Sequence, residues 1–153
     1  MEWRLLRGLS DEAARQVLSS ARRRRFAARE VLFHEGDPAG GMHLLAKGRV
    51  CMRVTTPAGD VATLELFVPG DVFGEMALLS PDAVRSATVV ALEATETLVI
   101  DEPTFTELRR RHPSVTEILL QLLGARVRRL NDRLLEALYV PADTRVMRRL
   151  FEV

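Results

Sequence analysis

The stretch Gly70–Val89 holds the residues of this sequence best suited to bind a ligand. After a glycine-containing turn, residues 74–79 can form a single helical turn, whose first amides point outward and prefer an anion. Gly74 permits close approach of the backbone, and Arg85 can close over the same anion with charge-assisted hydrogen bonds. Ser86 adds a hydroxyl donor. The pattern predicts a site for a small phosphate.

Glu75 needs a separate explanation, because a carboxylate aimed at a phosphate would repel it. Beside a ribose, the same side chain can accept a hydrogen bond from the 2′-hydroxyl, as acidic residues do in dinucleotide sites. A phosphate together with a sugar hydroxyl indicates a nucleotide. Taken separately, a Gly-Glu pair is usually a turn and an arginine between strands usually pairs with a surface carboxylate, but the order and spacing here favour the nucleotide site.

A strand-rich middle part of the chain would have to position these residues. The hydrophobic period changes near residues 22 and 102, which separates this part from helical segments on either side. Short β-type runs recur in it, at Val31–Phe33, Met42–Ala46, Val50–Thr55, Val61–Val68, Ala87–Leu92 and Thr97–Ile100. Spacing this regular predicts an antiparallel sandwich or barrel. Glycines mark its expected corners, at Gly36, Gly48, Gly59 and Gly70.

The N-terminal helical segment is predicted to be short. Ser10 is a suitable N-cap, and the helix ends before Arg22. The basic run Arg22–Arg25 has two interpretations, a phosphate-binding patch or a solvated strand edge or loop. The second is favoured, since charge runs usually form solvated faces, and the run is assigned no role.

The C-terminal segment predicts a short helix opened by Pro103 and then a long helix over residues 114–139. Ser114 with Glu117 forms a capping-box pattern, and about 26 residues of helix reach about 39 Å. Apolar residues recur at alternating spacings of three and four and form a narrow seam, made of Leu120, Leu123, Val127, Leu130, Leu134 and Ala137. A small β-domain cannot cover so long a helix. The seam therefore favours a homodimer through this helix over a core helix of one monomer.

The composition excludes several classes of protein. A chain of 153 residues, 47% hydrophobic and 28% charged, fits one globular domain rather than a disordered or fibrous chain. Its net charge of +1 provides no global field toward nucleic acid or anionic lipid. The single Cys51 excludes a disulfide framework and an all-cysteine metal cluster within the chain. With no apolar stretch near the roughly 20 residues that span a bilayer, we expect a cytoplasmic protein without a membrane partner.

An enzyme is the first rival interpretation, and the sequence does not favour it. His34, His43 and His112 are scattered, no Gly-x-Ser-x-Gly motif occurs, and Cys51 has no base visible in the sequence. A metal-binding jelly roll usually carries two histidines one residue apart, and this chain has no such pair. We therefore expect no catalytic residues, no metal and no cofactor other than the effector ligand.

The segment Phe73-Gly74-Glu75-Met76-Ala77-Leu78-Leu79, followed by Arg85-Ser86-Ala87-Thr88-Val89, resembles the phosphate-binding cassette of cyclic-nucleotide-binding domains. With the long seam helix, the chain is similar to the effector and dimerisation part of CRP/FNR-type transcription regulators. The resemblance implies an α+β, mainly β fold: an antiparallel double-stranded β-helix, a jelly-roll-like β-roll, with a short N-terminal helix and a long C-terminal dimerisation helix.

The same resemblance assigns roles to single residues. Gly74 and Ser86 would donate to the cyclic phosphate, Arg85 would form its ion pair, and Glu75 would hold the ribose hydroxyl. Serine after the arginine is typical of cAMP-responsive members, so cAMP is favoured over cGMP as the effector. The usual proline before the arginine is replaced by Val84, which leaves phosphate binding plausible and the loop geometry open.

The base contact departs further from the family pattern. Leu130 and Asn131 stand where cAMP-responsive regulators have a threonine and then a small polar residue that meet the adenine, one from each subunit. Asn131 can still bind a base edge, whereas Leu130 cannot. The family's oxygen sensors need several cysteines for their cluster, so the single Cys51 excludes that branch.

The resemblance divides the chain into a β-roll with its dimerisation helix, residues 1–139, and residues 140–153, a hinge with the first helix of a helix-turn-helix domain that is otherwise absent. We expect a trimmed chain, with a natural sensor-only protein as the alternative. The expected function is effector sensing in a bacterial regulator that controls DNA binding allosterically, with DNA bound only through the missing domain. The alternatives are a nucleotide-binding domain of a protein that does not bind DNA, and a family member with another effector or none.

Overall fold

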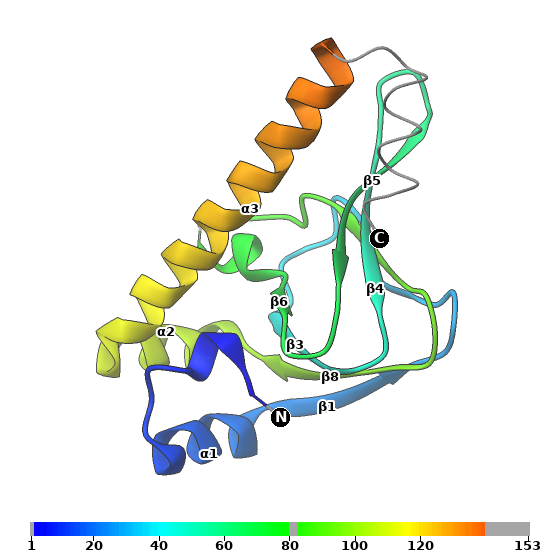
Figure 1. The fold of residues 1–153 in the computed structure, drawn as a ribbon. Helices are drawn as coiled ribbons and strands as arrows, with labels where there is room; N and C mark the ends of the chain where they lie inside the picture. Colours follow the sequence, from blue (N-terminus) through cyan, green and yellow to red (C-terminus); the bar gives the residue numbers. More distant parts are fainter. Residues whose placement is uncertain (1, 80–82, 140–153) are drawn as a thin grey trace. The chain divides into compact units, whose positions relative to one another are not determined.

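The computed structural model describes residues 2–79 and 83–139, which run from a short helical part through a set of strands to two helices (Figure 1). In chain order the elements are η1 (Arg4–Leu6), α1 (Asp11–Ser20), β1 (Arg22–Phe26), β2 (Val31–Phe33), β3 (Met42–Lys47), β4 (Val50–Thr55), β5 (Val61–Phe67), β6 (Val72–Phe73), η2 (Glu75–Leu78), β7 (Thr88–Ala91), β8 (Thr95–Ile100), α2 (Glu102–Arg111) and α3 (Pro113–Tyr139). The predicted divisions near residues 22 and 102 coincide with the starts of β1 and α2.

Two four-stranded antiparallel sheets form the middle of the chain. The first has the strand order β1-β8-β3-β6, and the second has the order β2-β7-β4-β5. In the first sheet β3 lies between β8 and β6, and His43 pairs with Val99 on one side and with Phe73 on the other. Because β6 leads directly into η2, this sheet positions the cassette. The predicted mainly β, antiparallel fold with terminal helices is confirmed.

Side chains from both sheets form one hydrophobic core cluster. Its buried members are Phe26, Leu32, Leu45, Val50, Phe67, Phe73, Val89 and Ala91. On β7, buried Val89 and Ala91 alternate with half-buried neighbours, as expected of a strand with one face on the core. Full burial of such apolar side chains contributes about 1.5–3 kcal/mol each. Phe73, which has no exposed surface, therefore anchors the chain immediately before the cassette turn.

The four corner glycines predicted from the sequence all have positive φ, between 87° and 97°. Gly48 shows why this matters, since a Cβ at this position would lie 2.5 Å from the carbonyl oxygen of Ala94. A side chain at residue 48 would thus combine backbone strain with a steric clash.

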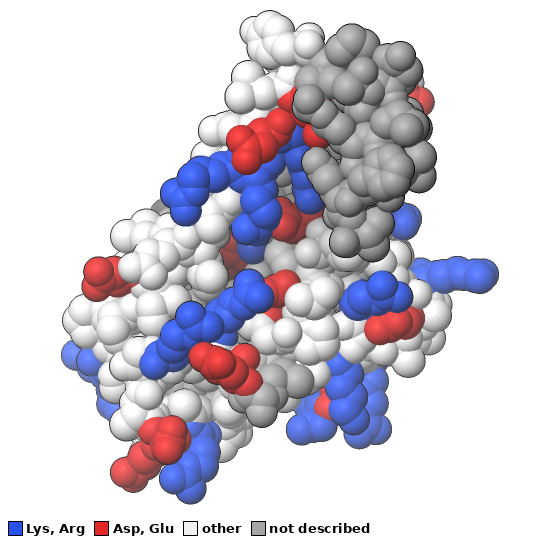
Figure 2. Space-filling view, in the orientation of Figure 1, with Lys and Arg blue, Asp and Glu red and all other residues white. Residues whose placement is uncertain are grey.

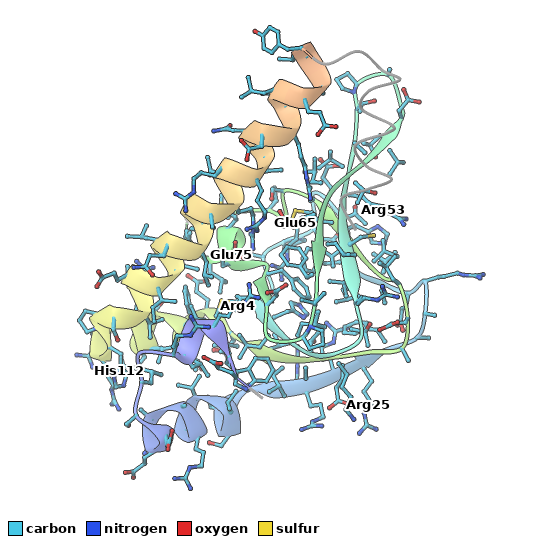
Figure 3. All side chains as sticks on the ribbon, in the orientation of Figure 1. Arg4, Arg25, Arg53, Glu65, Glu75 and His112 are labelled. Carbon is cyan, nitrogen blue, oxygen red and sulfur yellow. The ribbon has the colours of Figure 1, made fainter. Side chains whose placement is uncertain are left out.

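The short N-terminal helix and the basic run are as predicted. Ser10 caps α1 by accepting a hydrogen bond from the amide of Ala13 at 3.2 Å. Residues 22–25 lie in β1, the outer strand of the first sheet, where all four arginines are exposed. Arg23 and Arg25 pair with Glu96, and Arg25 projects away from β1 (Figure 3). Basic and acidic side chains are interspersed over the face drawn in Figure 2, in keeping with the small net charge.

The predicted cap of the long helix is wrong. The helix begins at Pro113, so that Ser114 lies inside its first turn instead of at the N-cap. Proline is favoured at the first helical position because its φ is preset and its missing N–H would have no helical partner there. The amide of Val115 donates to the carbonyl of His112 at 3.0 Å, which closes the turn between α2 and α3.

The chain divides into two compact units, Met1–Ile118 and Leu119–Val153. The 27 residues of α3 extend over about 40 Å. Of the predicted seam, Leu120, Val127 and Leu134 are exposed by 64%, 54% and 56%. Among the described residues, no helix is both long enough and apolar enough to span a bilayer. The predicted hinge and helix at residues 140–153 lie outside the described residues.

Candidate functional site

The helical turn of the cassette begins at a glycine that no other residue can replace without strain. Gly74 has φ 83° and ψ 5° and forms the N-cap of η2, so the predicted single turn is present as a 3₁₀ turn. A Cβ on residue 74 would lie 2.7 Å from Nη1 of Arg85 and 3.2 Å from the carbonyl oxygen of Gly41. Left-handed backbone and close packing both require glycine here.

Arg85 is fixed through its backbone by the turn that follows β2. Its amide donates to the carbonyl of Asp37 at 2.8 Å, and its carbonyl accepts from the amide of Gly36 at 2.8 Å. An isolated bridge between Pro38 and Val84 continues this pairing. Valine at residue 84, in place of the family's proline, is therefore compatible with a regular extended backbone before the arginine.

The side chain of Arg85 turns inward and meets the cassette. It is only 4% exposed, and it donates from Nη1 to the carbonyl of Gly74 at 3.0 Å and from Nη2 to the carbonyl of Gly41 at 2.7 Å. Its guanidinium carbon lies 4.0 Å from the centre of the Phe33 ring. The structure thus brings Arg85 into direct contact with Gly74, while their convergence on a shared anion stays a prediction.

Two contributors to this arrangement escaped the sequence analysis. Gly41 has φ 131°, and a Cβ there would lie 2.9 Å from Cγ1 of Val99, so the pair Gly40-Gly41 was a usable signal of close packing. Phe33 gave no comparable signal, because an aromatic residue on a strand normally packs in the core. The sequence pattern shows neither the carbonyl that Gly41 offers nor the ring beneath Arg85.

Two carboxylates act on the buried charge of Arg85. Burial lowers its pKa from the usual value, while Asp37 and Glu75 act in the opposite direction. A guanidinium has five N–H donors, and two donate to the carbonyls of Gly74 and Gly41. Its Nε is buried and has no hydrogen-bond partner among the described residues. An anion at this place would therefore meet a desolvated cation with donors to spare.

The other two predicted cassette residues differ in their surroundings. Glu75 lies on η2 (Figure 3) and is 1% exposed, and its charge interacts with that of Arg85. Ser86 follows Arg85 directly, and its side chain is exposed. The structure thus brings Gly74, Glu75 and Arg85 together and leaves the hydroxyl of Ser86 on the surface.

A buried histidine lies close to the same site. His43, on β3, stacks on Phe73 with ring centroids 5.0 Å apart and bonds through Nδ1 to Oγ1 of Thr97 at 3.0 Å. Burial, and then the charge of Arg85, lowers its pKa from 6.5 to about 3. At neutral pH His43 is therefore an uncharged member of the aromatic core.

The predicted base contacts and the seam lie on α3. Leu130 is half-buried and Asn131 is exposed. Leu123 is half-buried, and Ala137 is exposed. These residues belong to the second unit, and their predicted contacts with a base and with a partner helix stay predictions. No cluster of three or more metal-ligating side chains occurs within residues 2–79 and 83–139.

Comparison with known proteins places the chain in a family. A family model described as the cyclic nucleotide-binding domain matches residues 23–112, more than half of the chain. The chain is 38% identical over 124 residues to the cyclic AMP receptor protein of Thermus thermophilus, covering 81% of this chain and 57% of that protein. It is 24% identical over 128 residues to the CRP-like cAMP-activated global transcriptional regulator of Mycobacterium tuberculosis, covering 84% and 57%.

A solved structure supports the same assignment. The catabolite activator protein of Thermus thermophilus has a TM-score of 0.77 and 37% sequence identity, and the match covers 86% of this chain and 61% of that one. The chain thus spans less than two thirds of these relatives. From the matched domain, the fold and the sequence likeness together, the chain belongs to the cyclic-nucleotide-binding domain family, in the branch found in CRP-type transcription regulators.

Proposed function

We propose that this chain is the effector-sensing part of a bacterial CRP/FNR-type regulator and binds a cyclic mononucleotide, with cAMP favoured over cGMP. The observation that carries the proposal is the buried guanidinium of Arg85, which is 4% exposed, has donors left over, and lies against Gly74 and close to Glu75. A cyclic phosphate supplies an acceptor for the remaining N–H donors of Arg85, and its ribose supplies a hydroxyl for Glu75. The function is binding rather than catalysis.

Each cassette residue has a proposed role that follows from its chemistry. Arg85 pairs with the phosphate, and Gly74 allows the phosphate to approach the backbone. Glu75 accepts the 2′-hydroxyl, and exposed Ser86 adds a donor once its hydroxyl turns toward the ligand. Leu130 and Asn131 are the proposed neighbours of the base, with Asn131 supplying the polar contact.

The proposed signal passes through the dimerisation helix. A ligand that binds one arrangement of the dimer more tightly shifts a pre-existing equilibrium by its differential affinity, typically about 1–3 kcal/mol. In the whole regulator this shift would control a DNA-binding domain. The proposed location of such a regulator is the cytoplasm.

Isothermal titration calorimetry with cAMP and with cGMP tests the binding proposal. We expect saturable binding of cAMP, weaker binding of cGMP, and a loss of at least about 100-fold in affinity for Arg85→Ala, because a charge-assisted fork is removed from a desolvated site. Arg49→Ala is the matched control, since Arg49 is exposed and pairs only with Glu93 among the described residues. Absence of heat with both nucleotides, or equal affinities of Arg85→Ala and wild type, contradicts the proposal.

A further inference from the structure

The aromatic ring of Phe33 forms a platform for the guanidinium of Arg85. The guanidinium carbon lies 4.0 Å from the ring centre, well inside the roughly 6 Å over which a cation is attracted to an aromatic face. Two other cation–ring contacts occur among the described residues, at 4.9 Å for Arg24 on Phe26 and 5.7 Å for Arg109 on Phe105. The contact at Phe33 is the shortest of the three, and only here is the arginine buried.

Further rings hold Phe33 in place. Its centroid lies 5.6 Å from that of His43 and 6.2 Å from that of Phe73, and these two rings stack nearly parallel, 8° apart. His43 is itself held by Thr97. Since protonated His43 would repel Arg85, the neutral ring is the form that suits this arrangement.

The ring of Phe33 limits the tilt of the Arg85 guanidinium, which the hydrogen bonds of the side chain do not limit. The carbonyls of Gly74 and Gly41 hold the two terminal nitrogens at the edge of the guanidinium. Edge contacts alone permit the guanidinium to tilt, whereas a ring whose centre lies 4.0 Å from the guanidinium carbon adds a contact that opposes tilting. The opposite face and the remaining N–H groups then keep one orientation, which lowers the entropy cost of forming a fork with an anion.

We propose that Phe33 is a positioning residue for effector binding, which orients the guanidinium of Arg85 through its aromatic face. The inference rests on the proposed function, because the anion it serves is the cyclic phosphate. The competing interpretation is that Phe33 only fills space, as its partly buried packing against the core cluster allows. The two interpretations differ in what happens when the ring is replaced by an aliphatic side chain of similar hydrophobicity.

Three variants separate these interpretations. Phe33→Leu removes the aromatic face and keeps an apolar side chain, while Phe33→Tyr keeps the face. Phe67→Leu is the matched control, because Phe67 is a buried core phenylalanine whose ring, like that of Phe33, contacts the ring of Phe73, at 5.4 Å. Each variant is titrated with cAMP by calorimetry, and its unfolding in urea is measured alongside.

We expect Phe33→Leu to bind cAMP about tenfold more weakly, which equals about 1.4 kcal/mol, while Phe33→Tyr and Phe67→Leu stay within about twofold of wild type. A second readout needs no ligand: the Nε proton of Arg85 should show a ring-current shift in NMR spectra that disappears in Phe33→Leu and persists in Phe67→Leu. If Phe33→Leu binds cAMP like wild type, or is weakened no more than Phe67→Leu, the positioning role is wrong. If the wild-type protein binds no cyclic nucleotide, the proposed function fails and the positioning role fails with it. If the wild type binds and Phe33→Leu binds equally well, only the positioning role fails, so the two failures are distinguishable.

Discussion

The carbonyl of Gly74 accepts a hydrogen bond from Nη1 of Arg85 at 3.0 Å, and a Cβ on residue 74 would lie 2.7 Å from that same nitrogen. The glycine and the arginine of the cassette are thus in direct contact. Each residue limits the position of the other. A side chain introduced at residue 74 would therefore displace the guanidinium of Arg85 without altering its charge.

Gly74→Ala is therefore expected to weaken cAMP binding by at least about tenfold. The new methyl group would displace the guanidinium, and an L-residue in the left-handed region costs about 1–2 kcal/mol of stability. Gly59→Ala is the control, because Gly59 has φ 90° but no atom lies within 4 Å of the position that a Cβ would take there. Urea unfolding should show a loss of stability in both variants, larger in Gly74→Ala because of the added clash, and calorimetry should show a loss of affinity only in Gly74→Ala. Equal affinities would mean that the contact with Arg85 is unimportant for binding.

Much of the fold, and part of the candidate site, could be predicted from local sequence. Ser10 as a cap, β4 over Val50–Thr55 and the corner glycines all depend on neighbouring residues, so pattern and turn chemistry sufficed to predict them. The grouping of Gly74, Glu75 and Arg85 also followed, because the resemblance supplied the order and spacing.

The elements that escaped prediction depend on contacts between distant residues. β6 has two residues and exists through its pairing with β3. The four arginines of β1 show no alternation, so the sequence left a strand edge or a loop open, and pairing with β8 makes the run a strand. Phe33 lies on β2 in the second sheet and Gly41 lies just before β3 of the first sheet, so both reach Arg85 through the tertiary fold. The Gly40-Gly41 pair signals close packing, but no local pattern identifies Arg85 as the partner.

Glu75→Gln tests the proposed ribose contact. A carboxylate that accepts the 2′-hydroxyl should contribute about 1.5–3 kcal/mol, so this isosteric change is expected to weaken cAMP binding by about 10- to 100-fold. The matched ligand is 2′-deoxy-cAMP, which lacks the hydroxyl and should bind wild type and Glu75→Gln with similar affinity. Calorimetric titration of both ligands into both proteins measures the coupling. A variant that weakens both ligands equally would show that Glu75 supports the cassette without contacting the sugar.

Acid should destabilise the protein through His43. The folded state lowers the pKa of this histidine from 6.5 to about 3, so the unfolded chain binds the proton more readily. The contribution of neutral His43 is fully present above pH 6.5 and is lost as the pH falls toward 3. Between pH 7 and pH 5 this amounts to about 2 kcal/mol.

Urea unfolding at several pH values checks this dependence. His43→Gln keeps a polar partner for Thr97 but cannot take up the proton, so its stability should fall about 2 kcal/mol less than that of wild type over the same pH range. Carboxylates that titrate below pH 5 affect both proteins alike and cancel in the difference. If the free energy of unfolding of the two proteins falls in parallel with pH, groups other than His43 cause the acid sensitivity.

The proposed homodimer can be tested with two adjacent leucines of α3. Leu134 and Leu135 are exposed by 56% and 55%, but only Leu134 belongs to the predicted seam, and successive residues of a helix point about 100° apart. A charge buried in a coiled-coil seam is costly, whereas the same charge on a neighbouring face remains solvated. Leu134→Glu should therefore convert the dimer to a monomer at micromolar concentration, while Leu135→Glu should remain dimeric in sedimentation velocity measurements. Dissociation by both variants, or by neither, would place the interface on another surface.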